Sequence, residues 1–207
     1  MSERNSSEVT KTIAQTALFA ALCYVGFQFL RIDIPVGDSK TAFHLGNAFC
    51  VLAALLLGGV KGGLAGAIGM TIADLTSGYV TSAPQTFIMK FLIGVFVGLV
   101  AHKAGHLNEK TTAADKIKWS ALGAAAGMAF NVVVDPVMSY LRKRYLLGLD
   151  EKIANIVVKW SAMTTLVNAV LAVIVAVILY NSLAPVLRKA GFLQSTESRT
   201  EMKPEDK

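Results

Sequence analysis

The chain has 207 residues, 54% of them hydrophobic, with a mean hydropathy of +0.53 and a formal charge of +6. This composition is far more apolar than that of a soluble domain and indicates an integral membrane protein. The positive charge shows no aromatic-interleaved basic stripe, which argues against nucleic-acid binding. The chain also lacks the GxxxxGK motif followed by Ser or Thr, so it has no phosphate-binding loop with which to use ATP.

Six apolar segments follow one another along the chain, and an apolar helix of roughly 17–25 residues can cross a bilayer. They are predicted at residues 12–30, 44–60, 62–78, 86–102, 117–140 and 157–181. We therefore expect an all-α membrane protein with six transmembrane helices, formed by residues 1–187. The polar remainder, residues 188–207, is predicted to be a disordered cytoplasmic tail.

Six crossings place both termini on one side of the membrane. Lys and Arg are more numerous on that side than on the other, so the positive-inside rule predicts that both termini are cytoplasmic. The basic cluster at residues 142–144 falls on the outer side and opposes this orientation. Between the first two segments, residues 31–40 are too polar and too rich in turn-forming residues to cross, and we expect an outer loop there.

Small residues recur at four-residue spacing in three of the segments. They include Ala17 and Ala21 in the first, the glycines between residues 62 and 69 in the third, and Gly123 and Gly127 in the fifth. Such spacing lets helix backbones approach closely in lipid. We expect packing inside the bundle for the third and fifth segments. For the first segment, internal packing and a partner-binding surface are both open.

Polar side chains gather near the outer ends of the segments. Asp74, Lys90 and Asp135 are ionisable residues in apolar surroundings, which makes them candidate functional residues because hydrocarbon tolerates charge poorly. The other members of the predicted binding site are His44, Asn47, Tyr79, Gln85, Asn131, Trp160 and Asn168. A cluster on one side favours a pocket open to the outside, since a channel needs polar groups through the whole thickness.

Several of these residues also have a structural interpretation. Asp74 and Lys90 could neutralise each other across neighbouring helices, and His44 with Asn47 could begin an interfacial helix. Trp160 could be an aromatic anchor at the membrane surface. The residues alone do not choose between these roles and contact with a ligand.

Five strings carry a family resemblance: the AxxxA spacing of the first segment, HLGN at residues 44–47 leading into AALLLG, GGLAGAIG at 62–69, ADL at 73–75, and SAPQTFIMK at 82–90. With these strings, residues 10–185 resemble the substrate-binding S component of an energy-coupling factor (ECF) transporter. The resemblance implies a six-helix fold in a prokaryotic cell membrane. It also implies high-affinity binding of a vitamin from outside, and assembly with a transmembrane coupling protein and two ATPases.

The resemblance further implies that the small-residue face of the first helix, here Ala17 and Ala21, docks on the coupling protein. The strings look most like S components for the hydroxymethylpyrimidine precursor of thiamine or for vitamin B6 compounds. Pantothenate is the competing substrate, because Lys90 could pair with its carboxylate. Asp74 and Asp135 could instead bind an aminopyrimidine or the hydroxyls of a pyridine ring.

Two other classes of membrane protein fit the sequence less well. A stand-alone secondary transporter usually has an internal repeat and broken helices at corresponding positions, and the sequence shows neither. A membrane-embedded enzyme needs a nucleophile and base or a metal, and His44 has no obvious partner. His102 and His106 have no carboxylate or cysteine at ligand spacing, so we predict no metal site, no cofactor and no enzymatic activity.

Overall fold

The computed structural model describes residues 2–36 and 39–193. In this part of the chain, one α-helix coincides with each of the six predicted apolar segments. They are α1 (Ser2–Gln28), α2 (Gly46–Leu57), α3 (Gly59–Thr76), α4 (Ala83–Gly98), α5 (Ala113–Leu141) and α6 (Glu151–Lys189). Short helical turns adjoin α4 and α5: η1 (Val80–Ser82), η2 (Leu99–Ala104), η3 (Leu107–Glu109) and η4 (Arg142–Leu146).

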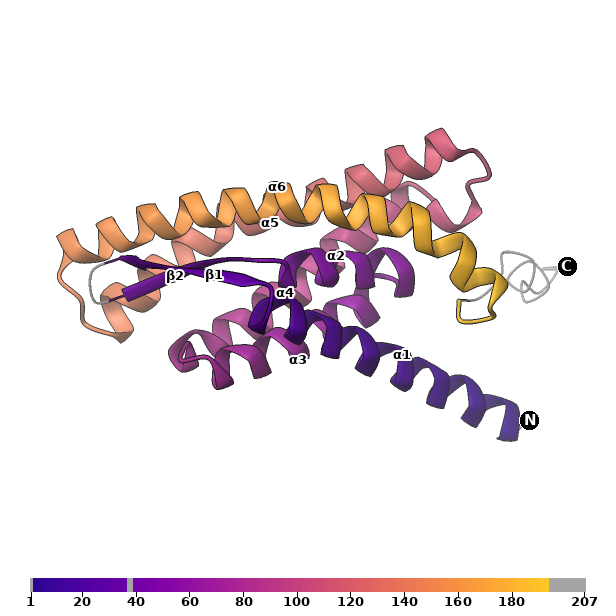
Figure 1. Ribbon diagram of the computed structural model, residues 1–207, viewed down its shortest axis with the longest axis horizontal. Helices are drawn as coiled ribbons and strands as arrows, with labels where there is room; N and C mark the ends of the chain where they lie inside the picture. Colours follow the sequence, from indigo (N-terminus) through magenta and orange to yellow (C-terminus); the bar gives the residue numbers. More distant parts are fainter. Residues whose placement is uncertain (1, 37–38, 194–207) are drawn as a thin grey trace, which may run out of the picture.

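The expected outer loop at residues 31–40 forms most of a β-hairpin. Strands β1 (Arg31–Val36) and β2 (Ser39–His44) pair antiparallel, with Arg31 opposite His44 and Val36 opposite Ser39. The hairpin lies alongside α6 (Figure 1). The all-α expectation therefore holds for the bundle, and this short sheet is an addition that the sequence analysis did not foresee.

In the described part of the chain, helices α2 and α3 fall outside the stretches whose length and composition suit a membrane crossing. Four helical stretches are long and apolar enough to cross a membrane, at residues 6–28, 80–104, 113–146 and 151–189. The 12 residues of α2 span only about 18 Å at about 1.5 Å per residue, less than the roughly 30 Å of a hydrocarbon core. A tight turn at Gly58, whose φ of +92° favours glycine, joins α2 to α3.

The core lies around α2, where residues 50–55 are almost fully buried. Close backbone contacts hold α3 against α4: a Cβ atom added to Gly94 would lie 2.3 Å from the Cα atom of Gly63. The glycines of α5 pack in the same way, because a Cβ atom on Gly127 would lie 2.5 Å from a methyl group of Val97. The small residues of the third and fifth segments thus pack inside the bundle, as the sequence predicts.

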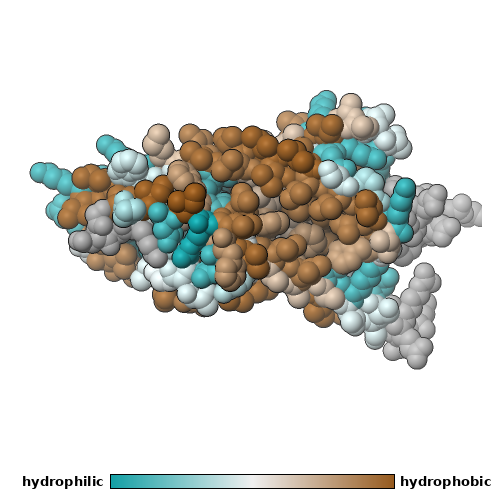
Figure 2. All heavy atoms as spheres, viewed as in Figure 1, coloured by the Kyte–Doolittle hydropathy of each residue, from teal (hydrophilic) through white to brown (hydrophobic). Residues whose placement is uncertain are grey.

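The outer surface of the bundle is apolar in its middle. Figure 2 shows hydrophobic side chains across the centre of one face and hydrophilic ones toward both ends. Large apolar side chains on α6, such as Met163, Ile174 and Ile178, are more than half exposed. Lipid is the solvent that suits such a belt.

The start of α1 and the end of α6 lie toward one end of the molecule, and the hairpin lies away from it (Figure 1). Lys11 Nζ donates a 2.6 Å hydrogen bond to the carbonyl oxygen of Gly191. Helix α6 continues past the predicted boundary at residue 187 to Lys189, and Leu193 is buried. Residues 194–207, which make up most of the predicted tail, lie outside the described residues.

Candidate functional site: a polar cavity between the helices

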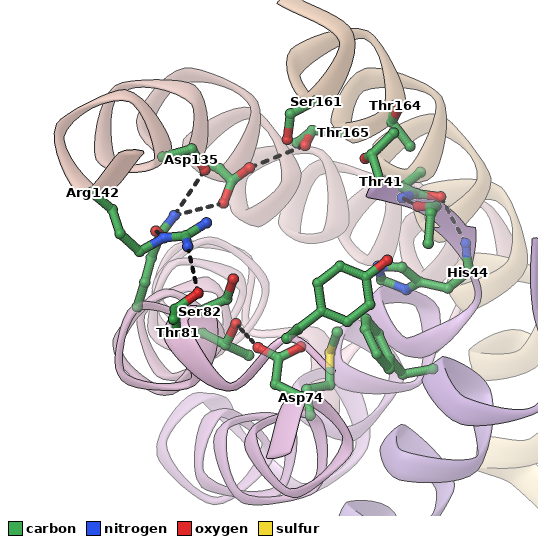
Figure 3. Close-up of a pocket in the computed structure, with 18 of the residues that line it drawn as sticks. Thr41, His44, Asp74, Thr81, Ser82, Asp135, Arg142, Ser161, Thr164 and Thr165 are labelled. Atoms are coloured by element: carbon green, nitrogen blue, oxygen red, sulfur yellow. Dashed lines mark hydrogen bonds between the residues drawn. The ribbon is translucent and has the colours of Figure 1, made fainter. Parts of the chain in front are cut away.

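A cavity of about 540 Å³ is lined by residues of the hairpin, η1, η4 and all six α-helices. Nine of the ten predicted site residues line it: His44, Asn47, Asp74, Tyr79, Gln85, Lys90, Asn131, Asp135 and Asn168. Trp160 is outside this lining and its side chain is 51% exposed. Figure 3 shows that the polar groups of the cavity come from several helices and face a common space.

Helical periodicity explains why so many polar groups face one space. Residues at i, i+3, i+4 and i+7 share a helix face. On α6 this spacing joins Ser161, Thr164, Thr165 and Asn168, which all line the cavity. Trp160 precedes Thr164 by four residues and lies at the edge of this face, outside the lining.

The same rule accounts for α5 and α4. Asn131, Asp135 and Ser139 follow one another at i, i+4 and i+8, and Thr86 precedes Lys90 by four residues; all five line the cavity. Sequence reasoning missed Ser139 and Thr86, together with Arg142, Ser161, Thr164 and Thr165. Their spacing from a predicted site residue was the signal that could have found them.

A hydrogen-bond network joins α4, α5 and α6 through Asp135 (Figure 3). Its two carboxylate oxygens accept from Gln85 Nε2 and from Thr165 Oγ1, each at 3.1 Å. Gln85 in turn accepts from Arg142 Nε at 3.1 Å. Because Asp135 on α5 bonds to one residue of α4 and one of α6, it fixes the spacing of these three helices around the cavity.

Asp74 and Lys90 do not form a salt bridge with each other. Asp74 Oδ2 accepts a hydrogen bond from Thr86 Oγ1. The side chain of Lys90 is only 8% exposed, and within residues 2–36 and 39–193 its ammonium group has no hydrogen bond or ion pair. Direct neutralisation, one of the two interpretations of this pair, is therefore absent from the structure.

Three further polar atoms in the cavity residues are enclosed and have no hydrogen-bond partner among the described residues. They are the side-chain oxygens of Asn47 and Asn131 and the Nδ1 atom of His44. A buried polar group without a partner carries a desolvation cost of about 1–3 kcal/mol. Offsetting this cost requires hydrogen-bonding groups that the described residues do not supply.

An aromatic wall closes one side of the cavity. The ring centroid of Phe27 lies 4.7 Å from that of His44 and 5.9 Å from that of Tyr79, and all three residues line the cavity. The Arg31 guanidinium carbon lies 5.5 Å from the Phe27 centroid. Such ring faces can stack on a flat heteroaromatic molecule.

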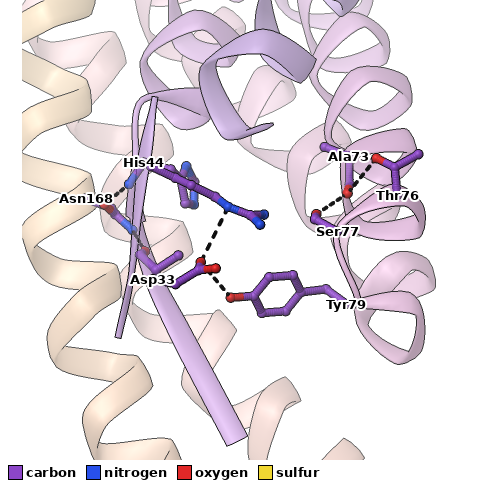
Figure 4. Close-up of polar contacts among 9 residues, drawn as sticks. Asp33, His44, Ala73, Thr76, Ser77, Tyr79 and Asn168 are labelled. Carbon is purple, nitrogen blue, oxygen red and sulfur yellow. Dashed lines mark hydrogen bonds and ion pairs between the residues drawn. The ribbon is translucent and has the colours of Figure 1, made fainter. Parts of the chain in front are cut away.

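Side chains from α6 and from the loop after α3 hold the hairpin (Figure 4). Asn168 donates to the carbonyl oxygen of Ala42 at 2.9 Å and accepts from the backbone N–H of His44 at 3.0 Å. The hydroxyl of Tyr79 donates to Asp33 at 3.3 Å. Burial, and next the nearby Asp33 carboxylate, raise the pKa of Tyr79, so this phenol remains a donor. Asn168 thus positions β2 as well as lining the cavity.

A second, apolar hollow of about 670 Å³ lies on the outer face of α1 and α3. Ala17 and Ala21, the predicted docking residues, are exposed and line it with Ile13, Leu64 and Ile68. We call this surface the α1–α3 groove.

Comparison with known proteins supplies the family. A family model described as "ECF-type riboflavin transporter, S component" matches residues 7–185. A UPF0397 protein of Enterococcus faecalis is 25% identical over 165 residues, which cover 77% of this chain and 88% of that protein. An uncharacterized protein of Pyrococcus woesei, encoded in the gap 3' region, is 36% identical over 69 residues, 33% of this chain and 46% of that protein.

No solved structure is significantly similar to the chain. The family match covers most of the sequence and includes all six helices as far as residue 185. It describes a family of transporter subunits rather than of enzymes. The chain belongs to the family of ECF-type riboflavin transporter S components.

Proposed function

We propose that this protein is the high-affinity substrate-binding subunit of an ECF-type importer in a prokaryotic cell membrane, working with a coupling membrane protein and two ATPases. The observation that carries the proposal is a polar cavity of about 540 Å³ inside a bundle whose outer surface is apolar. Polar groups inside a membrane bundle mark substrate pathways. The family supports this assignment.

We infer that the substrate is a vitamin or vitamin precursor with a small heteroaromatic ring, of the hydroxymethylpyrimidine or pyridoxine class. The rings of Phe27, His44 and Tyr79 provide a surface on which such a ring can stack. The carboxylates of Asp74 and Asp135 offer acceptors for ring amino or hydroxyl groups. Pantothenate is the second candidate, because the ammonium of Lys90, which has no partner among the described residues, suits its carboxylate. Riboflavin, which the family description names, is the comparison ligand.

The proposed orientation has both termini in the cytoplasm, all six helices in the membrane and the cavity opening to the outside. The hairpin and the basic residues of η4 then lie at the outer end. Under this proposal the α1–α3 groove faces the coupling protein, and the small side chains of Ala17 and Ala21 let a partner helix approach closely.

Substrate identity can be tested directly on the isolated protein. The protein purified in detergent is titrated calorimetrically with hydroxymethylpyrimidine, pyridoxine, pantothenate and riboflavin. We expect the tightest binding from one of the first two. Preferential binding of riboflavin or pantothenate would move the protein to that substrate class, and binding of none would remove the vitamin assignment.

The energy source separates an ECF subunit from a stand-alone transporter. Reconstituted alone in liposomes, the protein should bind its substrate without accumulating it, because it contains no nucleotide-binding motif. Accumulation should require the coupling protein, both ATPases and ATP. Gradient-driven accumulation by the purified chain alone would instead identify a secondary transporter.

A further inference from the structure

The carboxylates and the guanidinium of the cavity have hydrogen-bond partners, whereas its two ammonium groups have none among the described residues. From this difference we propose that the substrate presents an ionised oxygen to Lys90. The inference deepens the proposed function, on which it rests. It assigns Lys90 as the anion-binding group of the cavity and restricts the substrate to molecules with a carboxylate or an ionised ring hydroxyl.

The pairing is clear from the five charged residues of the lining. Both carboxylates accept hydrogen bonds from neutral donors: Asp74 from Thr86, and Asp135 from Gln85 and Thr165. Arg142 donates to Gln85 and to Thr81. In the described part of the chain, the ammonium groups of Lys90 and Lys143 have no hydrogen bond or ion pair.

Both lysines are buried, with Lys90 8% and Lys143 9% exposed, but their surroundings differ. Lys143 belongs to η4, where it follows Arg142 and precedes the exposed residues Tyr145 and Leu146. Lys90 lies on α4 between the buried residues Met89 and Ile93. A charge within the packed part of a membrane bundle is costly without a partner. We therefore assign Lys90, rather than Lys143, to the ligand anion.

The uncharged polar atoms of the cavity lining indicate which other groups the substrate carries. The enclosed oxygens of Asn47 and Asn131 have no partner among the described residues and can only accept. A matching ligand carries N–H or O–H donors in addition to its ionised oxygen. An anion without donors would leave the two asparagine oxygens unsatisfied, and a neutral ring without an ionised oxygen would leave Lys90 unpaired, so we expect both to bind more weakly.

Two chemical sources supply an ionised oxygen with donors. A 3-hydroxypyridine ring, as in pyridoxine, exists at neutral pH with an ionised ring oxygen and a protonated ring nitrogen. Pantothenate has a carboxylate together with hydroxyl and amide donors. Hydroxymethylpyrimidine is neutral, so the inference favours pyridoxine within the proposed heteroaromatic class.

The test compares Lys90→Met, Lys90→Arg and wild-type protein in calorimetric titrations with pyridoxine, pantothenate and hydroxymethylpyrimidine. Lys159→Met is the matched control, because Lys159 is exposed on α6 and does not line the cavity. We expect Lys90→Met to weaken binding of the compound that carries the ionised oxygen, pyridoxine or pantothenate, at least tenfold. This is the effect of losing a charge-assisted hydrogen bond. Lys90→Arg should retain more affinity than Lys90→Met, and the control should bind like wild type.

Thermal stability without ligand distinguishes binding from a structural role. Removing an unpaired buried charge should leave the melting temperature of Lys90→Met unchanged or raised. A lowered melting temperature with unchanged affinity would overturn the inference. Tight binding of neutral hydroxymethylpyrimidine that Lys90→Met does not weaken would also overturn it.

Mass spectrometry of the compound released from protein purified from cells keeps the two proposals separate. An anionic compound outside the vitamin classes, retained by wild type and absent from Lys90→Met, would support the anion subsite while refuting the vitamin assignment. A neutral compound retained by both proteins, or none in wild type, would overturn the anion subsite.

Discussion

The cavity and the α1–α3 groove are built on the same bundle but have opposite chemistry. The cavity is lined by charged and amide side chains, among them Lys90, whose ammonium has no partner within residues 2–36 and 39–193. The groove is lined mainly by alanine and aliphatic side chains, with Ala17 and Ala21 exposed in its wall. Helix α3 contributes to both, through Asp74 to the cavity and through Leu64 and Ile68 to the groove.

This difference indicates two kinds of occupant. Buried polar atoms without partners gain most from a ligand whose groups match them one by one. A surface of small apolar side chains in lipid has no such atoms, and it gains from a helix that packs closely against it. Substitutions that affect one region and spare the other therefore test whether the regions act separately.

The largest expected effect is at the groove. Ala17→Trp or Ala21→Trp should abolish uptake by the assembled transporter, because an indole at either position holds a partner helix away. Ligand affinity of the isolated protein should stay at the wild-type value. Uptake by cells that express the coupling proteins, and calorimetry on the purified subunit, measure the two quantities.

Ala125→Trp is the control for this experiment, since Ala125 is exposed on α5 and does not line the groove. It should transport normally. Normal assembly and uptake by the Ala17 and Ala21 variants would remove the docking assignment.

The next largest effect is expected at the cavity. Asp135→Asn replaces an acceptor of two hydrogen bonds, and we expect ligand affinity to fall at least tenfold, since loss of a charge-assisted hydrogen bond costs about 1.5–3 kcal/mol. Asp115→Asn makes the same change at the other end of α5, where Asp115 pairs with Thr112, and should leave affinity unchanged. Calorimetry on protein of confirmed melting temperature decides the outcome; equal affinity in both variants would exclude Asp135 from binding.

One substitution should affect both regions together. Gly94→Val forces methyl groups against the backbone of Gly63, and such overpacking typically costs about 1–3 kcal/mol. Because α3 supports the cavity and the groove, ligand binding and transporter assembly should both decline along with the melting temperature. Ala125→Val, at an exposed position, should leave all three unchanged. A Gly94→Val protein of wild-type stability would show that the α3–α4 contact is looser than described.

The smallest effect is expected at the hairpin. Tyr79→Phe removes the hydrogen bond to Asp33 but keeps the ring of the aromatic wall. A neutral hydrogen bond contributes about 0.5–1.5 kcal/mol, so ligand dissociation should become about 2- to 12-fold faster without a change in docking. Stopped-flow dissociation of bound ligand measures this rate. An unchanged rate would mean that the hairpin does not restrain the ligand through this bond.

The six helices and most of the side chains that line the cavity could be predicted from the sequence. Long apolar runs predict helices because only internally hydrogen-bonded backbone is stable in lipid. The i, i+4 spacing of Asn131 and Asp135 placed them on one face before any neighbouring helix was known. The rule extends to Ser161, Thr164, Thr165 and Asn168, which is why most of the lining was within reach of sequence reasoning.

Which polar groups meet depends on how the helices pack against one another. Helix periodicity does not say which neighbour a face contacts, so it could not show that Asp74 bonds to Thr86 instead of forming a salt bridge with Lys90. Nor could it show that residues 31–36 pair with 39–44 and attach to α6 through Asn168. These contacts join residues distant in sequence, and their geometry depends on how all the helices pack at once.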